Sequence, residues 1–140
     1  MKLKKILLPA LLLGSLLLTA CGKKSPQTVT LKLPSNPTTG YSWNVTQSEE
    51  LFDITSEFQQ PADQNLAGAG GTEVYTLKPK KEGTVTVEFA YARSWEEKEP
   101  ETKYTYELQV DKQMQVKVNS MTGYGPGSGD SGAVPQMIIE

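Results

Sequence analysis

The sequence contains no histidine, and Cys21 is the one cysteine in its 140 residues. Without histidine the chain lacks the usual general base, the usual zinc ligand and the partner that activates a serine or cysteine nucleophile. A single cysteine also excludes a disulfide bond within the chain. These absences disfavour an enzyme, and we expect neither a bound metal nor another cofactor.

Positive charge is also scarce beyond the first residues. The sequence has 14 Lys and Arg residues against 16 Asp and Glu. Three of the lysines lie in the first five residues, and their removal would leave 11 basic residues and a formal charge of −5. Because phosphate binding needs a basic face, nucleic acid is not expected as a partner.

The first 20 residues have the organisation of a secretory signal peptide. A basic MKLKK segment precedes the apolar stretch ILLPALLLGSLLL, and small residues follow in LTAC. This arrangement is typical of a signal rather than of a core helix. The Leu-Thr-Ala-Cys ending resembles the lipobox of bacterial lipoproteins, in which the cysteine is acylated and becomes the first residue. A signal with a coincidental cysteine is the alternative.

The lipobox resemblance implies a membrane contact through lipid on Cys21. Stable anchoring commonly takes more than one acyl chain, and lipobox processing typically supplies three. The protein would then be anchored to the bacterial cell envelope, facing outside the cytoplasm. Removal of residues 1–20 leaves 120 residues, which is enough for one domain with a hydrophobic core.

The remaining chain divides into three parts. Residues 21–27 read as a short tether, and residues 28–119 form the expected domain. The tail at residues 120–140 is rich in glycine, proline and serine. Such a segment buries too little apolar surface to offset its ordering entropy, so we expect it to be disordered.

Apolar and polar residues alternate along the domain with the period of two that half-buried strands show. The alternating runs are Thr28–Leu33, Tyr41–Val45, Phe52–Phe58 and Val85–Tyr91; Thr72–Leu77 is strand-like, although neither of its faces is purely apolar. No convincing amphipathic helix follows residue 20. Several short strands at near-regular spacing predict an all-β fold, an immunoglobulin-like antiparallel β-sandwich.

The last alternating run, Tyr104–Val118, is longer than a typical strand of about 3–10 residues. Its even-numbered positions carry apolar or aromatic residues and are interrupted only at Lys112. Either one long or bulged strand, or two strands joined near Asp111 and Lys112, would give this pattern. We favour the long or bulged strand.

Two segments superficially suggest ligand sites. Glu96, Glu97, Glu99 and Glu101 form an acidic cluster, but their spacing lacks the Asp, Asn and Gly pattern of a calcium loop. The run Gly68–Gly71 precedes a strand, whereas a phosphate-binding loop opens a helix and carries Lys-Ser/Thr. Both segments are therefore interpreted as loops without a metal or phosphate.

The stretch NPTTGY at residues 36–41 combines stiff and permissive residues. Pro37 fixes its own backbone angle and keeps Asn36 extended, while Thr38 and Thr39 have restricted side-chain rotamers. Gly40 can adopt angles that are closed to other residues. The stretch looks built to hold a polar tip in one shape, although by itself it also fits an ordinary turn.

Two further loops have features of a binding surface. The connection Gln59–Gly71 is long and ends in glycines that permit close backbone approach; a flexible linker is the alternative. Arg93, the one arginine of the chain, is separated from Trp95 by a single residue in a glutamate-rich loop. Exposed Trp and Arg are enriched at interface hot spots, although Trp95 could also simply cover a sheet end. Trp43 alternates with Tyr41 and Val45 and is expected in the core.

Together these motifs resemble the chagasin-type inhibitors of papain-like cysteine proteases. NPTTGY, GAGGT (residues 68–72) and R-x-W occur in the order and approximate spacing of that family, and the resemblance covers roughly Thr28 to Val118. It implies an immunoglobulin-like sandwich with three neighbouring loops at one end. The implied protease-binding residues are Asn36, Pro37, Thr38, Thr39, Gly40, Tyr41, Gly68, Ala69, Gly70, Gly71, Arg93 and Trp95.

The resemblance also implies a role for each loop in a reversible, monomeric inhibitor. Thr38 and Thr39 would enter the protease cleft, and residues 68–71 would form backbone hydrogen bonds along one side of it. Trp95 would pack beside the catalytic histidine of the protease, with Arg93 adding polar contacts. Ser94 stands where the family often has proline, so this loop is expected to be less rigid.

A different class of function remains open at this point. An immunoglobulin-like surface lipoprotein could act as an adhesin or as a structural module of the envelope, because such sandwiches host many functions. A lipoprotein enzyme with Ser or Thr and a Lys base has no supporting spacing. The inhibitor hypothesis requires Thr38, Gly70 and Trp95 to lie side by side at one end of the fold.

Overall fold

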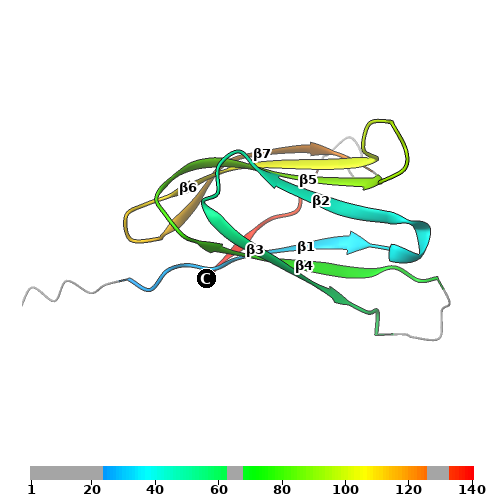
Figure 1. Ribbon diagram of the computed structural model, residues 1–140. Helices are drawn as coiled ribbons and strands as arrows, with labels where there is room; N and C mark the ends of the chain where they lie inside the picture. Colours follow the sequence, from blue (N-terminus) through cyan, green and yellow to red (C-terminus); the bar gives the residue numbers. More distant parts are fainter. Residues whose placement is uncertain (1–23, 63–67, 126–132) are drawn as a thin grey trace, which may run out of the picture.

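The structure is a computed structural model that describes residues 24–62, 68–125 and 133–140. Two antiparallel four-stranded sheets face each other, with strand orders β3-β4-β1-β8 and β2-β5-β6-β7 (Figure 1). The strands are β1 Val29–Ser35, β2 Tyr41–Gln47, β3 Phe52–Gln59, β4 Gly71–Pro79, β5 Gly83–Arg93, β6 Thr102–Val110, β7 Val116–Tyr124 and β8 Ile138–Ile139. One 3₁₀ turn, η1 Pro37–Thr39, is the helical element of the described residues. The predicted all-β antiparallel sandwich is confirmed.

The core between the sheets follows from the alternation in the sequence. Most inward positions of β1, β5 and β6 are apolar and almost fully buried, while their neighbours face outward; the polar Ser35 and Thr102 are buried at the strand ends nearest the loops. Trp43 on β2 is 8% exposed, as expected for a core residue. The other buried hydrophobic residues are Val29, Leu31, Leu33, Leu51, Phe52, Tyr75, Leu77, Val85, Val87, Phe89, Tyr104, Tyr106, Leu108, Val110 and Val116.

The favoured single strand from Tyr104 to Val118 is wrong, because the chain turns at residues 111–115 between β6 and β7. The Asp111 carboxylate accepts hydrogen bonds from the backbone N–H groups of Gln113 and Gln115, at 2.8 and 2.9 Å. Val110 pairs with Val116 across the hairpin, so even positions stay in phase through the turn. The period of two therefore could not reveal it.

The expected disorder of residues 120–140 is wrong for two parts of the tail. Strand β7 continues to Tyr124, and β8 pairs with the start of β1. The hydroxyl of the fully buried Tyr106 donates to the Pro135 carbonyl at 2.8 Å, and Ile139 packs against the core. The apolar residues near the end of the chain bury surface against the core. The glycine-rich composition of the tail as a whole gave no sign of this. Residues 126–132 lie outside the described residues.

The predicted tether is partly attached to the domain. Gln27 donates its backbone N–H to the Met114 carbonyl at 3.0 Å, and its side-chain oxygen accepts from the Val116 N–H at 2.8 Å. The Ser25 carbonyl accepts from the Gln115 side chain. Cys21 and the predicted signal peptide lie outside the described residues. No helix in residues 24–62, 68–125 or 133–140 is long and apolar enough to cross a bilayer.

Among the described residues, no strand pairs with β1 on its β8 side beyond Thr30. Thr28 exchanges two backbone hydrogen bonds with Glu140, so the backbone groups of alternate residues along β1 point to the β8 side. Pro34 falls in this set and has no N–H. Its carbonyl accepts from the Trp43 indole N–H at 3.0 Å. The β1 edge nearest Ser35 therefore offers few groups for pairing with another strand.

Candidate functional site

Three connections lie at the same end of the sandwich, opposite the end where the N-terminal segment enters (Figure 1). We call residues 36–41, between β1 and β2, the central loop. Residues 68–71, which lead into β4, are the glycine loop, and residues 93–101, between β5 and β6, are the tryptophan loop. These loops contain every predicted protease-binding residue.

The central loop is a compact turn with an internal hydrogen-bond network. Pro37–Thr39 form η1, and Gly40 closes it in the left-handed conformation at φ 80°. The Thr38 hydroxyl donates to the Asn36 side-chain oxygen at 2.6 Å, and the Thr39 hydroxyl donates to the Asn36 carbonyl at 2.7 Å. Both threonines are exposed, yet their hydroxyl protons are already engaged. The loop tip is thus held in one shape before any partner binds.

Asn36 also fixes the central loop to its surroundings. Its backbone N–H donates to the Tyr91 hydroxyl on β5 at 2.9 Å. Its side-chain N–H donates to the Gly68 carbonyl at 3.0 Å, which joins the central loop to the glycine loop. At Gly70, an added Cβ would come within 3.1 Å of the Ser35 carbonyl oxygen, so a side chain would push the two segments apart.

Arg93 joins the tryptophan loop to the central loop. Its Nε–H donates to the Thr39 carbonyl at 3.1 Å, and its Nη1 donates to the Glu96 carboxylate at 3.1 Å. The guanidinium lies 4.4 Å from the centre of the Tyr41 ring and 5.9 Å from that of Trp95, within the range of cation–π contacts. The resemblance implied that Arg93 contacts the protease, whereas here its guanidinium holds groups of its own chain.

Trp95 lies across the central loop and remains accessible. Its ring contacts Gly40 so closely that an added Cβ at Gly40 would overlap Cη2 of the indole. The side chain is 67% exposed, the highest value among the large hydrophobic side chains of the described residues. One part of the indole therefore rests on Gly40 while the rest is open to solvent.

Glu96 is the electrostatic centre of the tryptophan loop. Its carboxylate pairs with Lys98 at 2.8 Å and with Arg93 at 3.1 Å. These hydrogen bonds, first from Lys98 and then from Arg93, lower the pKa of Glu96 below its ordinary value. Among the described residues no group of three or more Asp, Glu, Cys or His side chains is arranged to hold a metal ion. Of the acidic cluster, Glu96 thus contributes two ion pairs that hold the loop.

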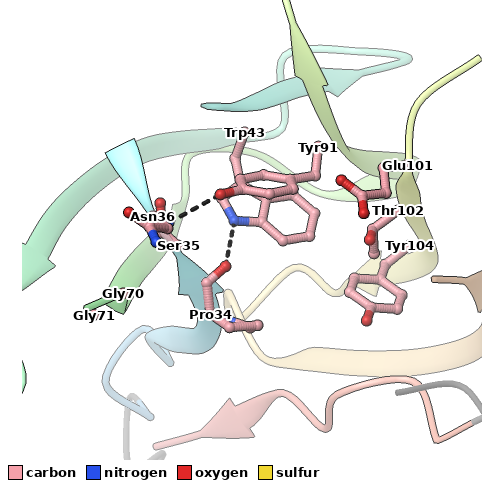
Figure 2. A pocket seen from close by; sticks show the side chains of 10 residues that line it. All are labelled: Pro34, Ser35, Asn36, Trp43, Gly70, Gly71, Tyr91, Glu101, Thr102 and Tyr104. Atoms are coloured by element: carbon pink, nitrogen blue, oxygen red, sulfur yellow. Dashed lines mark hydrogen bonds between the residues drawn. The ribbon is translucent and has the colours of Figure 1, made fainter. Parts of the chain in front are cut away.

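A cavity of about 390 Å³ lies beneath the loops between the two sheets (Figure 2). The Trp43 and Tyr91 rings lie 4.8 Å apart, and Tyr104 stacks on Trp43 at 5.8 Å. Figure 2 shows the bonds from Asn36 to Tyr91 and from Trp43 to Pro34 at the wall of this cavity. The aromatic stack therefore forms the base on which the central loop stands.

The structure brings the predicted site residues together. Hydrogen bonds run from the central loop to the glycine loop through Asn36 and to the tryptophan loop through Arg93. Sequence reasoning missed Tyr91 and Glu96 as supporting residues. Tyr91 could have been found as the last inward aromatic of its strand, and Glu96 by its i,i+3 spacing from Arg93.

These features define a class of protein: a β-sandwich that presents a stiff, exposed loop surface suited to contact with another protein. Residues 24–110 match the family described as Chagasin family peptidase inhibitor I42. The chain belongs to this chagasin family of peptidase inhibitors. Membership supports protease inhibition and confirms the expectation that the chain is not an enzyme.

Individual relatives agree with this assignment. Chagasin from Trypanosoma cruzi is 36% identical over 88 residues, covering 59% of this chain and 76% of the relative. Amoebiasin-2 from Entamoeba histolytica is 32% identical over 85 residues, covering 59% and 69%. The crystal structure of the cysteine protease inhibitor EhICP2 from Entamoeba histolytica is similar with a TM-score of 0.52 and 32% identity, covering 60% of this chain and 78% of that one.

The contact between Gly40 and Trp95 can be tested with a matched pair of substitutions. Gly40 and Gly68 both have φ near +80°, but an added Cβ meets the indole at Gly40 and nothing within 4 Å at Gly68. Each alanine should cost about 1 kcal/mol for the left-handed backbone. Gly40→Ala should in addition displace Trp95 and increase iodide quenching of tryptophan fluorescence. Equal quenching in the two variants would contradict the contact.

The ion pairs of Glu96 predict a pH dependence of the tryptophan loop. Because the folded-state pKa lies below the unfolded value near 4.5, the pairs stabilise the loop above that value and are lost as the pH falls through the folded pKa. Trp95 fluorescence should therefore be constant from neutral pH down to the unfolded-state value and change only as the pH falls below it. Glu96→Gln should abolish this transition and Glu97→Gln should keep it. A transition that survives in Glu96→Gln would assign it to another group.

Proposed function

We propose that the chain is a reversible inhibitor of papain-like cysteine proteases that occludes the active-site cleft with its three loops. The observation that carries the proposal is the hydrogen bonding of the central loop to the glycine loop on one side and to the tryptophan loop on the other. A surface that is ordered before binding loses little conformational entropy in the complex. The cysteine protease inhibitor EhICP2, which has a similar structure, gives the proposal its target class.

The conformation of the central loop explains how it could fill a cleft without being cleaved. A peptide that adds to a protein as a strand must be extended. Here Pro37–Thr39 form a 3₁₀ turn and Gly40 is left-handed, so no extended segment is available at the tip. The tip would enter the cleft as a wedge that excludes substrate and water. No peptide bond of the loop would lie in a position for attack.

The two flanking loops would hold the wedge in place. The exposed part of Trp95 offers apolar area for packing on the protease surface beside the cleft. The glycine loop can approach the other side closely and form backbone hydrogen bonds. Protease–inhibitor interfaces typically bury about 1,600 Å² and are among the tightest known. Three adjacent loops at a sandwich end could supply an interface of that kind.

The anchoring and assembly of the protein are separate parts of the proposal. The LTAC sequence supports acylation of Cys21, attachment to a bacterial envelope membrane and exposure outside the cytoplasm. The N-terminal segment enters at the end opposite the loops, so the loops of an anchored monomer would point away from the membrane (Figure 1). No relative or structure named above favours the alternative of an adhesin or envelope module.

Lipid attachment is tested by expressing the full chain in a bacterial host with labelled palmitate. The wild-type chain should incorporate label and fractionate with membranes, because two or more acyl chains bind a bilayer stably. Cys21→Ser should do neither. A wild-type chain that remains unlabelled and leaves the membrane in buffer would disprove the anchor without affecting the inhibitor proposal.

Inhibition is tested by titrating active papain with residues 22–140. The domain should inhibit, and Trp95→Ala should raise the inhibition constant about 30-fold, since truncating an interface hot spot costs about 2 kcal/mol. Ile138→Ala removes a similarly exposed hydrophobic residue at the opposite end and should have no effect. Failure of the folded wild-type domain to inhibit papain and related proteases would reject the function. An unchanged constant for Trp95→Ala would reject the role of that residue.

A further inference from the structure

A second exposed aromatic side chain, Phe58, lies beside the central loop. Phe58 is 38% exposed near the end of β3, and its ring covers Gly71, where an added Cβ would come within 2.6 Å of Cζ. Trp95 contacts Gly40 at the end of the central loop, whereas Phe58 lies near Pro37 and Thr38 at its start. The central loop therefore has an accessible aromatic ring near each of its ends.

Phe58 forms part of a groove of about 410 Å³. Its walls include Pro37 and Thr38 of the central loop and Gly68 and Ala69 of the glycine loop, with Pro61 beyond the end of β3. Among the described residues that line the groove, none carries a charge. Thr38 and Gln60 add polar groups, but Phe58, Pro37, Pro61 and Ala69 make the lining largely apolar. A groove of this size and lining suits an apolar side chain and would disfavour an unpaired charge.

The position of Phe58 in β3 gives the ring little role in the core. Phe52, on the same face of the strand, is 1% exposed, and Ile54 packs against the core. Residues 55–57 are exposed, so the strand has left the core before Phe58. A large ring at this exposure contributes less to folding than a buried one, whereas covering it with a partner would remove further apolar area from water.

We propose that Phe58 is a specificity-determining contact and that its groove takes an apolar side chain from the rim of the protease cleft. This inference rests on the proposed function, because the groove is continuous with two loops of the inhibitory surface. A protease that presents an apolar side chain there gains contact with Phe58 and Pro61. A protease with a charged side chain at that place must desolvate it against described wall residues that carry no charge. Phe58 thus distinguishes among proteases that all accept the central loop.

The test compares Phe58→Ala and Phe58→Leu by inhibition of a panel of papain-like proteases. Phe58→Ala should raise the inhibition constant about tenfold for some members, mainly through faster dissociation, and leave others unchanged. Phe58→Leu keeps an apolar side chain and should stay near the wild-type value. Ile138→Ala serves as the control for loss of an exposed hydrophobic residue elsewhere.

Stability is measured on the same variants by urea unfolding. Should Phe58→Ala lose its cooperative transition, Phe58→Gln replaces it, with the same expected loss of inhibition. Unchanged constants across the panel for Phe58→Ala, while Trp95→Ala weakens inhibition, would overturn the role of Phe58 and leave the inhibitor function standing. A folded wild-type domain that inhibits no member would overturn the function itself. An equal increase in the inhibition constant for every protease would show that Phe58 is a general contact, and would overturn its role in specificity.

Discussion

The hydrogen bonds of Asn36 are the constraint on which the loop surface depends. This one residue accepts from Thr38 and Thr39, donates to the Tyr91 hydroxyl, and donates to the Gly68 carbonyl. A net hydrogen bond contributes about 1 kcal/mol, whereas ordering one backbone residue costs about 1–2 kcal/mol. Several bonds on a single residue are therefore needed to keep a short exposed loop in one conformation. Without them the loop surface would have to become ordered during association with a partner.

The residues of the loop surface fall into two groups. Some stabilise the loops through bonds within the chain, and others expose apolar side chains to solvent. In the first group, polar side-chain groups bond to other groups of the chain, as in Asn36, Arg93 and Glu96. Trp95 and Phe58 instead leave apolar area open to solvent. One side chain cannot easily do both, because a polar group whose hydrogen bonds are all made within the chain has few left for a partner. In the proposed complex, affinity would depend on Trp95 and Phe58, and the entropic cost of binding would depend on Asn36, Arg93 and Glu96.

The sequence was sufficient for most of the fold and for the three loops, for different reasons. Alternation identified β1, β2 and β5 because most of their inward positions are covered by the opposite sheet, whereas β3 is covered only at its start. It failed at the turn between β6 and β7, where Val110 and Val116 pair and keep the phase, and at β8, which is too short to show a period. The motifs located the loops, but the bond from Arg93 to the Thr39 carbonyl spans 54 positions and has no local signal. The exposure of Phe58 likewise depends on where β3 leaves the core.

Pro34 affects how copies of the protein associate with one another at high concentration. Exposed strand edges invite growth of a sheet from one molecule into the next, and proline at an edge suppresses it. On β1 the proline stands directly before the loop surface, and its carbonyl is already bound by Trp43. Edge-to-edge stacking of molecules through this part of β1 is thereby blocked. At high local density, the loop end of the protein is therefore less open to self-association along that strand.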